Sequence, residues 1–158
     1  MSYPITTAIR FLREKNISFE PMLYAYEEHG GTKRSSEELN VPEKQIIKTI
    51  VMKTDEGEPF IILMHGDREV SMKQLARTMG VKQITMCSEA EVTKFTGYVV
   101  GGTSPFGTKR RLDVYVESSI FALPYICING GKRGFLVKMH PMDLKRAFEV
   151  VEVEVGID

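Results

Sequence analysis

Two kinds of hydrophobic pattern alternate along the chain, one typical of helices and one typical of strands. Helices are predicted where a capping residue opens a segment or where apolar residues recur every three to four positions. In the order of the chain these helices cover residues 3–15, a short segment from Ser35, residues 71–80, residues 88–97 and a segment from Pro141. A brief helical turn is also expected at Pro42.

Strands are predicted where β-branched or alternating residues form short runs between turns. The runs are 17–26, 46–54, 60–64, 112–116, 125–128, 135–139 and 150–155. Pro21 interrupts the first run, which favours an edge strand. Residues 46–54 and 60–64 are joined by a glycine-containing turn, which predicts an antiparallel hairpin.

Strands and helices do not alternate regularly, so the pattern predicts an α+β fold. We expect a mixed, mainly antiparallel sheet with flanking helices that cover one side of it. About seven strands are enough for the sheet to curl towards a barrel, and the pattern alone does not decide whether it does.

Composition narrows the class of protein. The 158 residues are 42% hydrophobic and 27% charged, which predicts one globular domain over residues 1–158. Lys plus Arg and Asp plus Glu each total 21, so any contact with nucleic acid must come from local clusters of cations. No signal peptide or membrane span is recognisable, and the two cysteines lie far apart, which favours a reduced cytoplasm.

The most informative stretch is a glycine-rich loop. Gly101 and Gly102 follow a β-branched run, Pro105 fixes a turn, and Gly107 precedes the cations 109–111. Free N–H groups in such a loop can form a concavity for an anion or a polarised carbonyl. A second, smaller glycine loop, with Lys132 and Arg133 in it, covers residues 129–134.

Several other kinds of site are disfavoured. The loop is not a Walker A motif, because Thr108 precedes Lys109 where that motif needs Gly-Lys-Ser/Thr. The three histidines and two cysteines have no metal-ligand spacing, so we expect no metal and no cofactor. Ser104 lies in the loop without a nucleophile-elbow pattern, which favours a turn residue or a ligand contact over a nucleophile.

Four other features each allow two interpretations. Lys48 lies in an apolar strand and either extends its ammonium to solvent or points it into a pocket. Tyr24 and Tyr26 are either exposed on an edge strand or form a wall on which a base stacks. The cations 109–111 are either a solvated run or a phosphate site, and Asn129 either caps a turn or recognises a polar ligand.

Taken in order, three segments resemble the YbaK/EbsC family. They are residues 46–51 (IIKTIV), 101–107 (GGTSPFG) and 125–134 (YICINGGKRG), and the similarity extends over essentially the whole chain. Members of the family are free-standing aminoacyl-tRNA deacylases related to the editing domain of bacterial prolyl-tRNA synthetases. The resemblance implies a mixed sheet curled towards a barrel and the removal of a wrongly attached amino acid from tRNA, most often cysteine from the proline tRNA.

The resemblance also implies roles for residues. The catalytic group would be Lys48 with the backbone N–H groups of Gly101 and Gly102, which hold the ester carbonyl and its oxyanion. The substrate-binding residues would be Tyr24, Tyr26, Thr49, Thr103, Ser104, Pro105, Phe106, Gly107, Asn129 and Gly130. The tRNA-binding cations would be Lys109, Arg110, Arg111, Lys132 and Arg133.

No protein nucleophile is required, because water or the thiol of a cysteinyl ester can attack the carbonyl. The expected partners are aminoacylated tRNA and, as a second candidate, prolyl-tRNA synthetase; the oligomeric state stays open. Asn129 and Leu136 stand where family members often have Ser and an acidic residue. These two departures leave the preferred amino acid open, and they keep a non-catalytic module that binds a tRNA end or a synthetase as the alternative.

Overall fold

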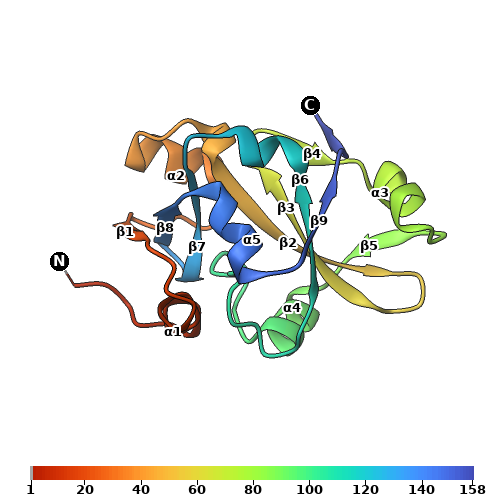
Figure 1. Ribbon diagram of the computed structural model, residues 1–158, viewed down its shortest axis with the longest axis horizontal. Coiled ribbons are helices and arrows are strands. Elements are labelled where there is room, and N and C mark those ends of the chain that lie inside the picture. The colour runs from red at the N-terminus through yellow and green to blue at the C-terminus, as the bar shows by residue number, and fades with distance from the viewer. Residues whose placement is uncertain (1) are drawn as a thin grey trace.

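The computed structural model describes residues 2–158 and is built around one long hairpin (Figure 1). Its strands are β2 (Ile46–Thr54) and β3 (Pro59–His65), which pair in antiparallel register. All seven residues of β3 are buried. The reason is that alternate side chains of β3 enter two different cores: Ile61 and Leu63 enter the main core, and Ile62 and Met64 enter a second core on the opposite face.

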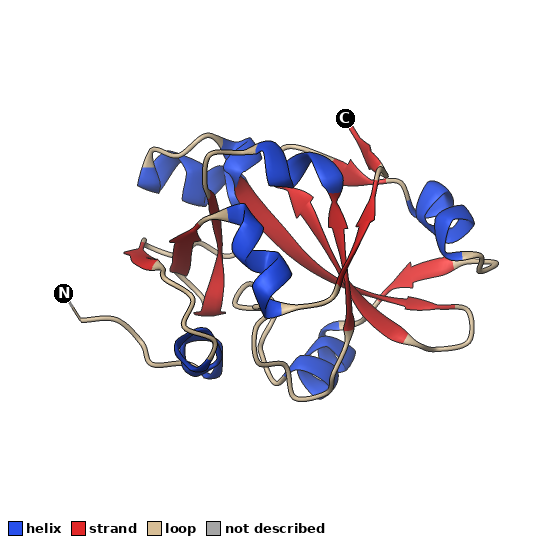
Figure 2. Ribbon diagram, viewed as in Figure 1, coloured by secondary structure: helices blue, strands red, loops and turns tan. Residues whose placement is uncertain are grey.

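The large sheet has the order β1-β8-β7-β2-β3-β6-β9, and β5 pairs separately with β2. The further strands are β1 (Glu20–Leu23), β5 (Ile84–Met86), β6 (Asp113–Glu117), β7 (Ile126–Lys132), β8 (Phe135–Met139) and β9 (Val150–Val153). The pairs β2–β7, β3–β6 and β6–β9 are parallel and the other pairs are antiparallel. The predicted mixed sheet with flanking helices is therefore confirmed, and Figure 2 shows how twist fans its strands.

The helices lie on both faces of the sheet. The main core contains buried residues of α1 (Thr7–Glu14), α4 (Glu89–Thr96) and α5 (Leu144–Ala147), whereas α3 (Met72–Met79) packs into the second core. The expectation that helices cover one side was therefore wrong. Because β3 is apolar on both faces, each face needs a covering layer.

Most helix boundaries follow the capping signals. Ser71 opens α3 by accepting a hydrogen bond from the Gln74 N–H at 3.2 Å, and Ser88 forms a complete capping box at the start of α4. Two starts differ from the prediction. The first helix begins at Thr7 rather than residue 3, and α2 (Gly31–Leu39) already contains Ser35, whose hydroxyl donates to the Thr32 carbonyl instead of capping.

Short elements complete the chain. A second, two-stranded sheet pairs β4 (Glu69–Val70) with β10 (Gly156–Ile157). The 3₁₀ segments are η1 (Glu43–Gln45), η2 (Ser118–Ala122) and η3 (Pro141–Asp143). The strands β4, β5 and β10 are only two or three residues long, too short for a periodicity to predict them. No helix within residues 2–158 combines the length and the apolar character that a bilayer crossing requires.

Candidate functional site

A cavity opens where β2 lacks a neighbouring strand along part of one edge. On this edge β7 pairs with Ile46 and Ile47, and β5 pairs with residues 52–54. Within the described residues 2–158, positions 48–51 between them pair with no strand on this edge. The cavity at this opening, which we call the β2 cavity, has a volume of about 480 Å³.

Four parts of the chain surround the β2 cavity. They are the segment from β1 into α2, the β5–α4 junction, the first glycine loop and the β7–β8 hairpin. The lining residues that carry the argument below are Tyr26, Lys48, Thr49, Cys87, Gly101 and Asn129. Tertiary pairing therefore brings together Lys48, both tyrosines and the beginnings of both glycine loops.

Lys48 lies on the cavity wall, and its ammonium group is already held. The nitrogen donates a hydrogen bond to the backbone carbonyl of Arg68 and lies 3.4 Å from the Glu69 carboxylate. The Lys48 side chain is 20% exposed, whereas that of Glu69 is 74% exposed. An ammonium has three N–H donors, so one donor of Lys48 is left for a ligand.

Thr49 presents polar groups at the open edge. The carbonyl of Val51 accepts from the N–H of Cys87 at 3.1 Å, on the edge of β2 that faces β5. Backbone groups alternate in direction along a strand, so the N–H and carbonyl of Thr49 face the same edge, inside the gap. The Thr49 hydroxyl oxygen is buried and has no hydrogen-bond partner within the described residues.

The first glycine loop bends sharply at the cavity. Gly101 has φ +90°, which residues with a side chain rarely adopt, and a Cβ there would lie 2.5 Å from the hydroxyl of Tyr26, so any other residue would strain the loop and displace the Tyr26 ring. The next N–H, that of Gly102, donates to the Val99 carbonyl at 2.9 Å, and Gly102 is buried. This N–H is therefore not available to an oxyanion, contrary to our expectation, whereas Gly101 and Thr103 do line the cavity.

The second half of this loop turns away from the cavity. Ser104, Pro105 and Phe106 are buried, and the Ser104 hydroxyl accepts from the Phe106 N–H at 3.1 Å. Phe106 stacks on two other phenylalanine rings, and Gly107 packs against the start of α1. These four residues, expected at the substrate, instead anchor the loop in the main core.

Asn129 connects the two glycine loops. Its side-chain oxygen accepts from the N–H of Gly131 at 2.6 Å, and its side-chain nitrogen donates to the Gly101 carbonyl at 3.3 Å. Gly130 is buried beneath the ring of Phe135, so of the two predicted contacts only Asn129 lines the cavity. Asn129 thus both shapes its own turn and fixes the first loop.

The two tyrosines and Arg133 form one wall. Arg133 donates to the Val100 carbonyl at 3.0 Å, and its guanidinium lies 5.3 Å from the centre of the Tyr26 ring. Burial, and to a smaller extent the neighbouring Tyr26, raises the pKa of Tyr24. Both Tyr24 and Tyr26 are partly buried and line the cavity, which favours the wall over exposure on an edge strand, and base stacking on them stays a prediction.

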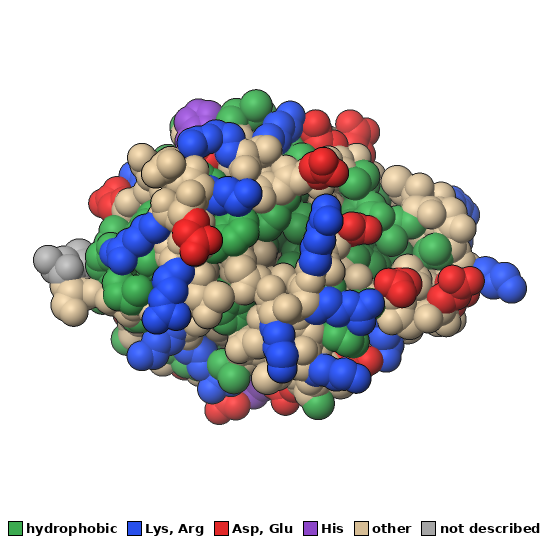
Figure 3. All heavy atoms as spheres, turned by 60° about the horizontal axis from the view of Figure 1, so that its bottom comes forward, with side chains coloured by type: hydrophobic (Ala, Val, Ile, Leu, Met, Phe, Trp, Pro, Cys, Tyr) green, Lys and Arg blue, Asp and Glu red, His purple; other side chains and the backbone are tan. Residues whose placement is uncertain are grey.

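The remaining predicted cations lie outside the cavity. Residues 109–111 come after the first glycine loop and lie beside the C-terminal end of α4, where the Arg110 N–H donates to the Phe95 carbonyl at 2.9 Å. The guanidinium of Arg110 covers the Phe95 ring and lies 3.6 Å from Glu58. Lys132 is exposed at the tip of the β7–β8 hairpin. Figure 3, in which the lower side of Figure 1 comes forward, shows Lys and Arg side chains spread over that face.

Several side chains that line the cavity were not singled out from the sequence, among them those of Arg34, Glu89 and Cys87. Cys87 is buried in the cavity wall, and burial raises the pKa of its thiol. The other cysteine, Cys127, is buried and has its pKa raised by burial to about 11. A thiol with a raised pKa is a poor nucleophile at neutral pH, so neither cysteine is suited to attack an ester. Nothing around Cys87 in the sequence marks it as a cavity residue.

Comparisons with known proteins identify similarities in sequence. Residues 29–147 match the family model described as the aminoacyl-tRNA editing domain. A protein of Enterococcus faecalis named "Putative Cys-tRNA(Pro)/Cys-tRNA(Cys) deacylase EbsC" is 27% identical over 137 residues, which cover 86% of this chain and 84% of that protein. A proline–tRNA ligase of Brachyspira hyodysenteriae is 29% identical over 112 residues, which cover 71% of this chain but only 19% of the ligase.

A solved structure has the same fold as this chain. The "Crystal structure of a putative trans-editing enzyme for prolyl tRNA synthetase" superposes with a TM-score of 0.86 at 19% identity. The superposition covers 99% of this chain and all of the other. At this identity the similarity is evidence for the fold.

Proposed function

This chain belongs to the aminoacyl-tRNA editing domain family, and from this membership we propose that it is a trans-editing deacylase that removes cysteine mischarged onto the proline tRNA. The family match supports the reaction class, and the name of the Enterococcus relative supports the amino acid and the tRNA. The similarity to proline–tRNA ligases supports a prolyl-tRNA synthetase as a second partner.

One observation carries the proposal: Lys48, Gly101 and the open edge of β2 surround a single cavity. An aminoacyl ester is already activated, so a catalyst has mainly to orient it and to stabilise negative charge on the carbonyl oxygen. Lys48 supplies a positive charge and a free N–H donor. The N–H of Gly101 has no hydrogen-bond acceptor within residues 2–158, so it replaces Gly102 as the backbone donor in this proposal.

The attacking group comes from outside the protein. Ser104 is fully buried and both cysteine thiols have raised pKa values, which disfavours all three as nucleophiles. With a cysteinyl ester, the substrate sulfur attacks its own carbonyl carbon, the bond from that carbon to the ribose oxygen breaks, and the proton of the thiol ends on that oxygen. With other esters, water attacks the same carbon and a free amino acid leaves.

The test compares cysteinyl and seryl esters on the same proline tRNA. Sulfur is the better nucleophile, so substrate assistance predicts much faster loss of cysteine than of serine. Equal rates would exclude thiol assistance and leave hydrolysis. No loss of amino acid from any ester, with tRNA still bound, would refute the deacylase and support a binding module.

The binding module stays the second candidate because of one specific observation. Leu136 is 5% exposed and lines the cavity, an apolar residue where the resemblance implies an acidic one. Replacing Leu136 by Asp tests whether this position limits the reaction. A gain in deacylation rate would show that the native residue restricts activity.

A further inference from the structure

The ammonium group of Lys48 is held by a turn that is distant in the sequence. This turn, residues 66–68, connects β3 to β4 and presents the carbonyl of Arg68 to the Lys48 nitrogen. Glu69, the next residue, supplies the carboxylate 3.4 Å from the same nitrogen. The position of Lys48 in the β2 cavity therefore depends on what fixes this turn.

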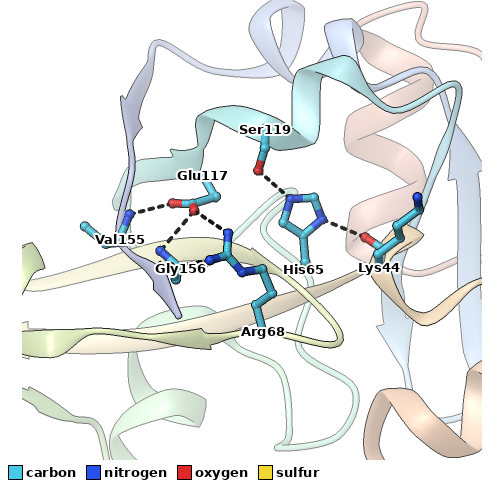
Figure 4. Close-up of polar contacts among 7 residues, drawn as sticks. All are labelled: Lys44, His65, Arg68, Glu117, Ser119, Val155 and Gly156. Carbon is cyan, nitrogen blue, oxygen red and sulfur yellow. Dashed lines mark hydrogen bonds and ion pairs between the residues drawn. The ribbon is translucent and has the colours of Figure 1, made fainter. Parts of the chain in front are cut away.

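The Arg68 side chain ties the turn to the C-terminal strand. Its guanidinium donates to the Gly156 carbonyl at 2.6 Å and lies 3.5 Å from the carboxylate of Glu117 (Figure 4). The Glu117 carboxylate is only 5% exposed and accepts the N–H groups of Val155 at 2.7 Å and Gly156 at 2.9 Å. A Cβ on Gly156 would lie 2.6 Å from the Glu117 carboxylate, so the backbone of Gly156 packs closely against this side chain.

The other end of the turn is fixed independently. His65 lies buried between η1 and η2: its Nδ1 donates to the Lys44 carbonyl at 2.8 Å, and its Nε2 is 2.7 Å from the Ser119 hydroxyl (Figure 4). The Arg68 N–H donates to the His65 carbonyl at 3.1 Å. The Thr32 hydroxyl donates to the Gly66 carbonyl at 3.0 Å. The end of the turn that contacts Lys48 is set by the pairing of β4 with β10 and, on the side-chain level, by Arg68 and Glu117.

We propose that Arg68 and Glu117 are positioning residues for Lys48, which act by clamping the β3–β4 turn to the C-terminal strand. The inference rests on the proposed deacylase function, because it gives Lys48 a reaction to serve. A carboxylate as buried as Glu117 is costly unless it is paired and hydrogen-bonded, and here it links the Arg68 side chain to the N–H groups of Val155 and Gly156. Small displacements of a group that contacts the reacting atoms lower rates strongly.

The primary test is a double-mutant cycle on cysteinyl-tRNA. Arg68→Ala removes the charged partner of Glu117 but leaves that carboxylate its two backbone N–H donors, and thermal melting checks that the variant folds. We expect kcat to fall about tenfold with KM within about twofold of the wild type, and Arg68→Lys to recover part of the loss. Arg77→Ala, which removes an exposed arginine of α3, is the matched control and leaves kcat unchanged.

The cycle separates an effect of Arg68 that acts through Lys48 from a loss of activity that does not involve Lys48. In a Lys48→Ala background, Arg68→Ala should change the residual rate by less than about twofold, because the residue through which it acts is gone. An equal loss in both backgrounds would overturn the proposal, as would a folded Arg68→Ala protein with wild-type kcat.

A second measurement needs no enzyme activity. In lysine-labelled protein, the NMR signal of the Lys48 side chain, assigned from its absence in Lys48→Ala, should shift towards exposed lysines in Arg68→Ala and in Glu117→Gln, but not in Arg77→Ala. An unmoved Lys48 signal in folded Arg68→Ala overturns the clamp. If the wild type deacylates no ester while this signal does shift, the proposed function fails and the structural link between Arg68 and Lys48 stands.

Discussion

Replacing Lys48 by Met isolates the charge on the cavity wall. Methionine keeps most of the apolar stem and removes only the ammonium. This change removes an ion pair with Glu69, whose side chain is 74% exposed, and pairs with an exposed partner contribute about 0–1 kcal/mol. It also removes the hydrogen bond to the Arg68 carbonyl, and hydrogen bonds of charged groups contribute about 1.5–3 kcal/mol. Loss of one preorganised electrostatic contact to an oxyanion costs on the order of 10²–10³ in rate. The variant should therefore remain folded, with a loss of stability limited to these two contacts, and be nearly inactive.

Single-turnover deacylation of cysteinyl-tRNA and urea denaturation measure the two effects separately. Lys48→Arg is the second variant: it keeps the charge, but its planar, longer guanidinium does not reproduce the geometry at the Arg68 carbonyl, and we expect strong impairment. A folded Lys48→Met protein with a rate near that of the wild type would remove Lys48 from the mechanism. A Lys48→Met protein that is unfolded without urea would contradict the expectation that only the contacts with Arg68 and Glu69 are lost.

Three further predictions concern the loop, the tRNA contact and the pH dependence. Gly101→Ala should abolish deacylation. Gly57 also has a positive φ, of +81°, but has open space around it, so Gly57→Ala should cost only backbone strain. Deacylation rates and thermal melting of both variants test this. Replacing residues 109–111 by alanine should flatten the salt dependence of tRNA binding by about one unit of slope for each phosphate that the variant no longer binds. A hydrogen bond from Lys53, the largest cause, lowers the pKa of Glu91 to about 2. The stability from this pair is therefore present above the usual pKa of a glutamate and is lost as the pH falls towards 2. In Glu91→Gln the free energy of unfolding should depend less on pH in that window.

For each of these predictions, one result would contradict it. Equal deacylation by the Gly101 and Gly57 variants would mean that the close approach of Tyr26 does not matter. An unchanged salt slope would move the tRNA interface away from residues 109–111. An acid-unfolding curve of Glu91→Gln that matches the wild type would show that the pair with Lys53 contributes nothing to stability.

Local chemistry let the sequence alone predict much of this fold. The hairpin of β2 and β3 and the caps of α3 and α4 depend on residues within a few positions of one another, and the structure has them where the pattern indicates. The fully apolar run of β3 also required two cores, although the pattern did not reveal that helices would lie on both faces. The start of α2 was missed because Gly30 and Gly31 are typical of a chain break, and the structure has them at the start of the helix.

The candidate site was only half determined by the sequence. Lys48, Gly101 and Asn129 could be singled out by residue type, but their grouping arises because β7 and β5 pair with opposite ends of β2 and leave a gap between them. The availability of each group was also decided in three dimensions: Gly102 gives its N–H to Val99, and Lys48 is held by a carbonyl twenty residues away. Hydrogen-bond partners that are distant in the chain leave no periodicity in it, so only the folded structure specifies them.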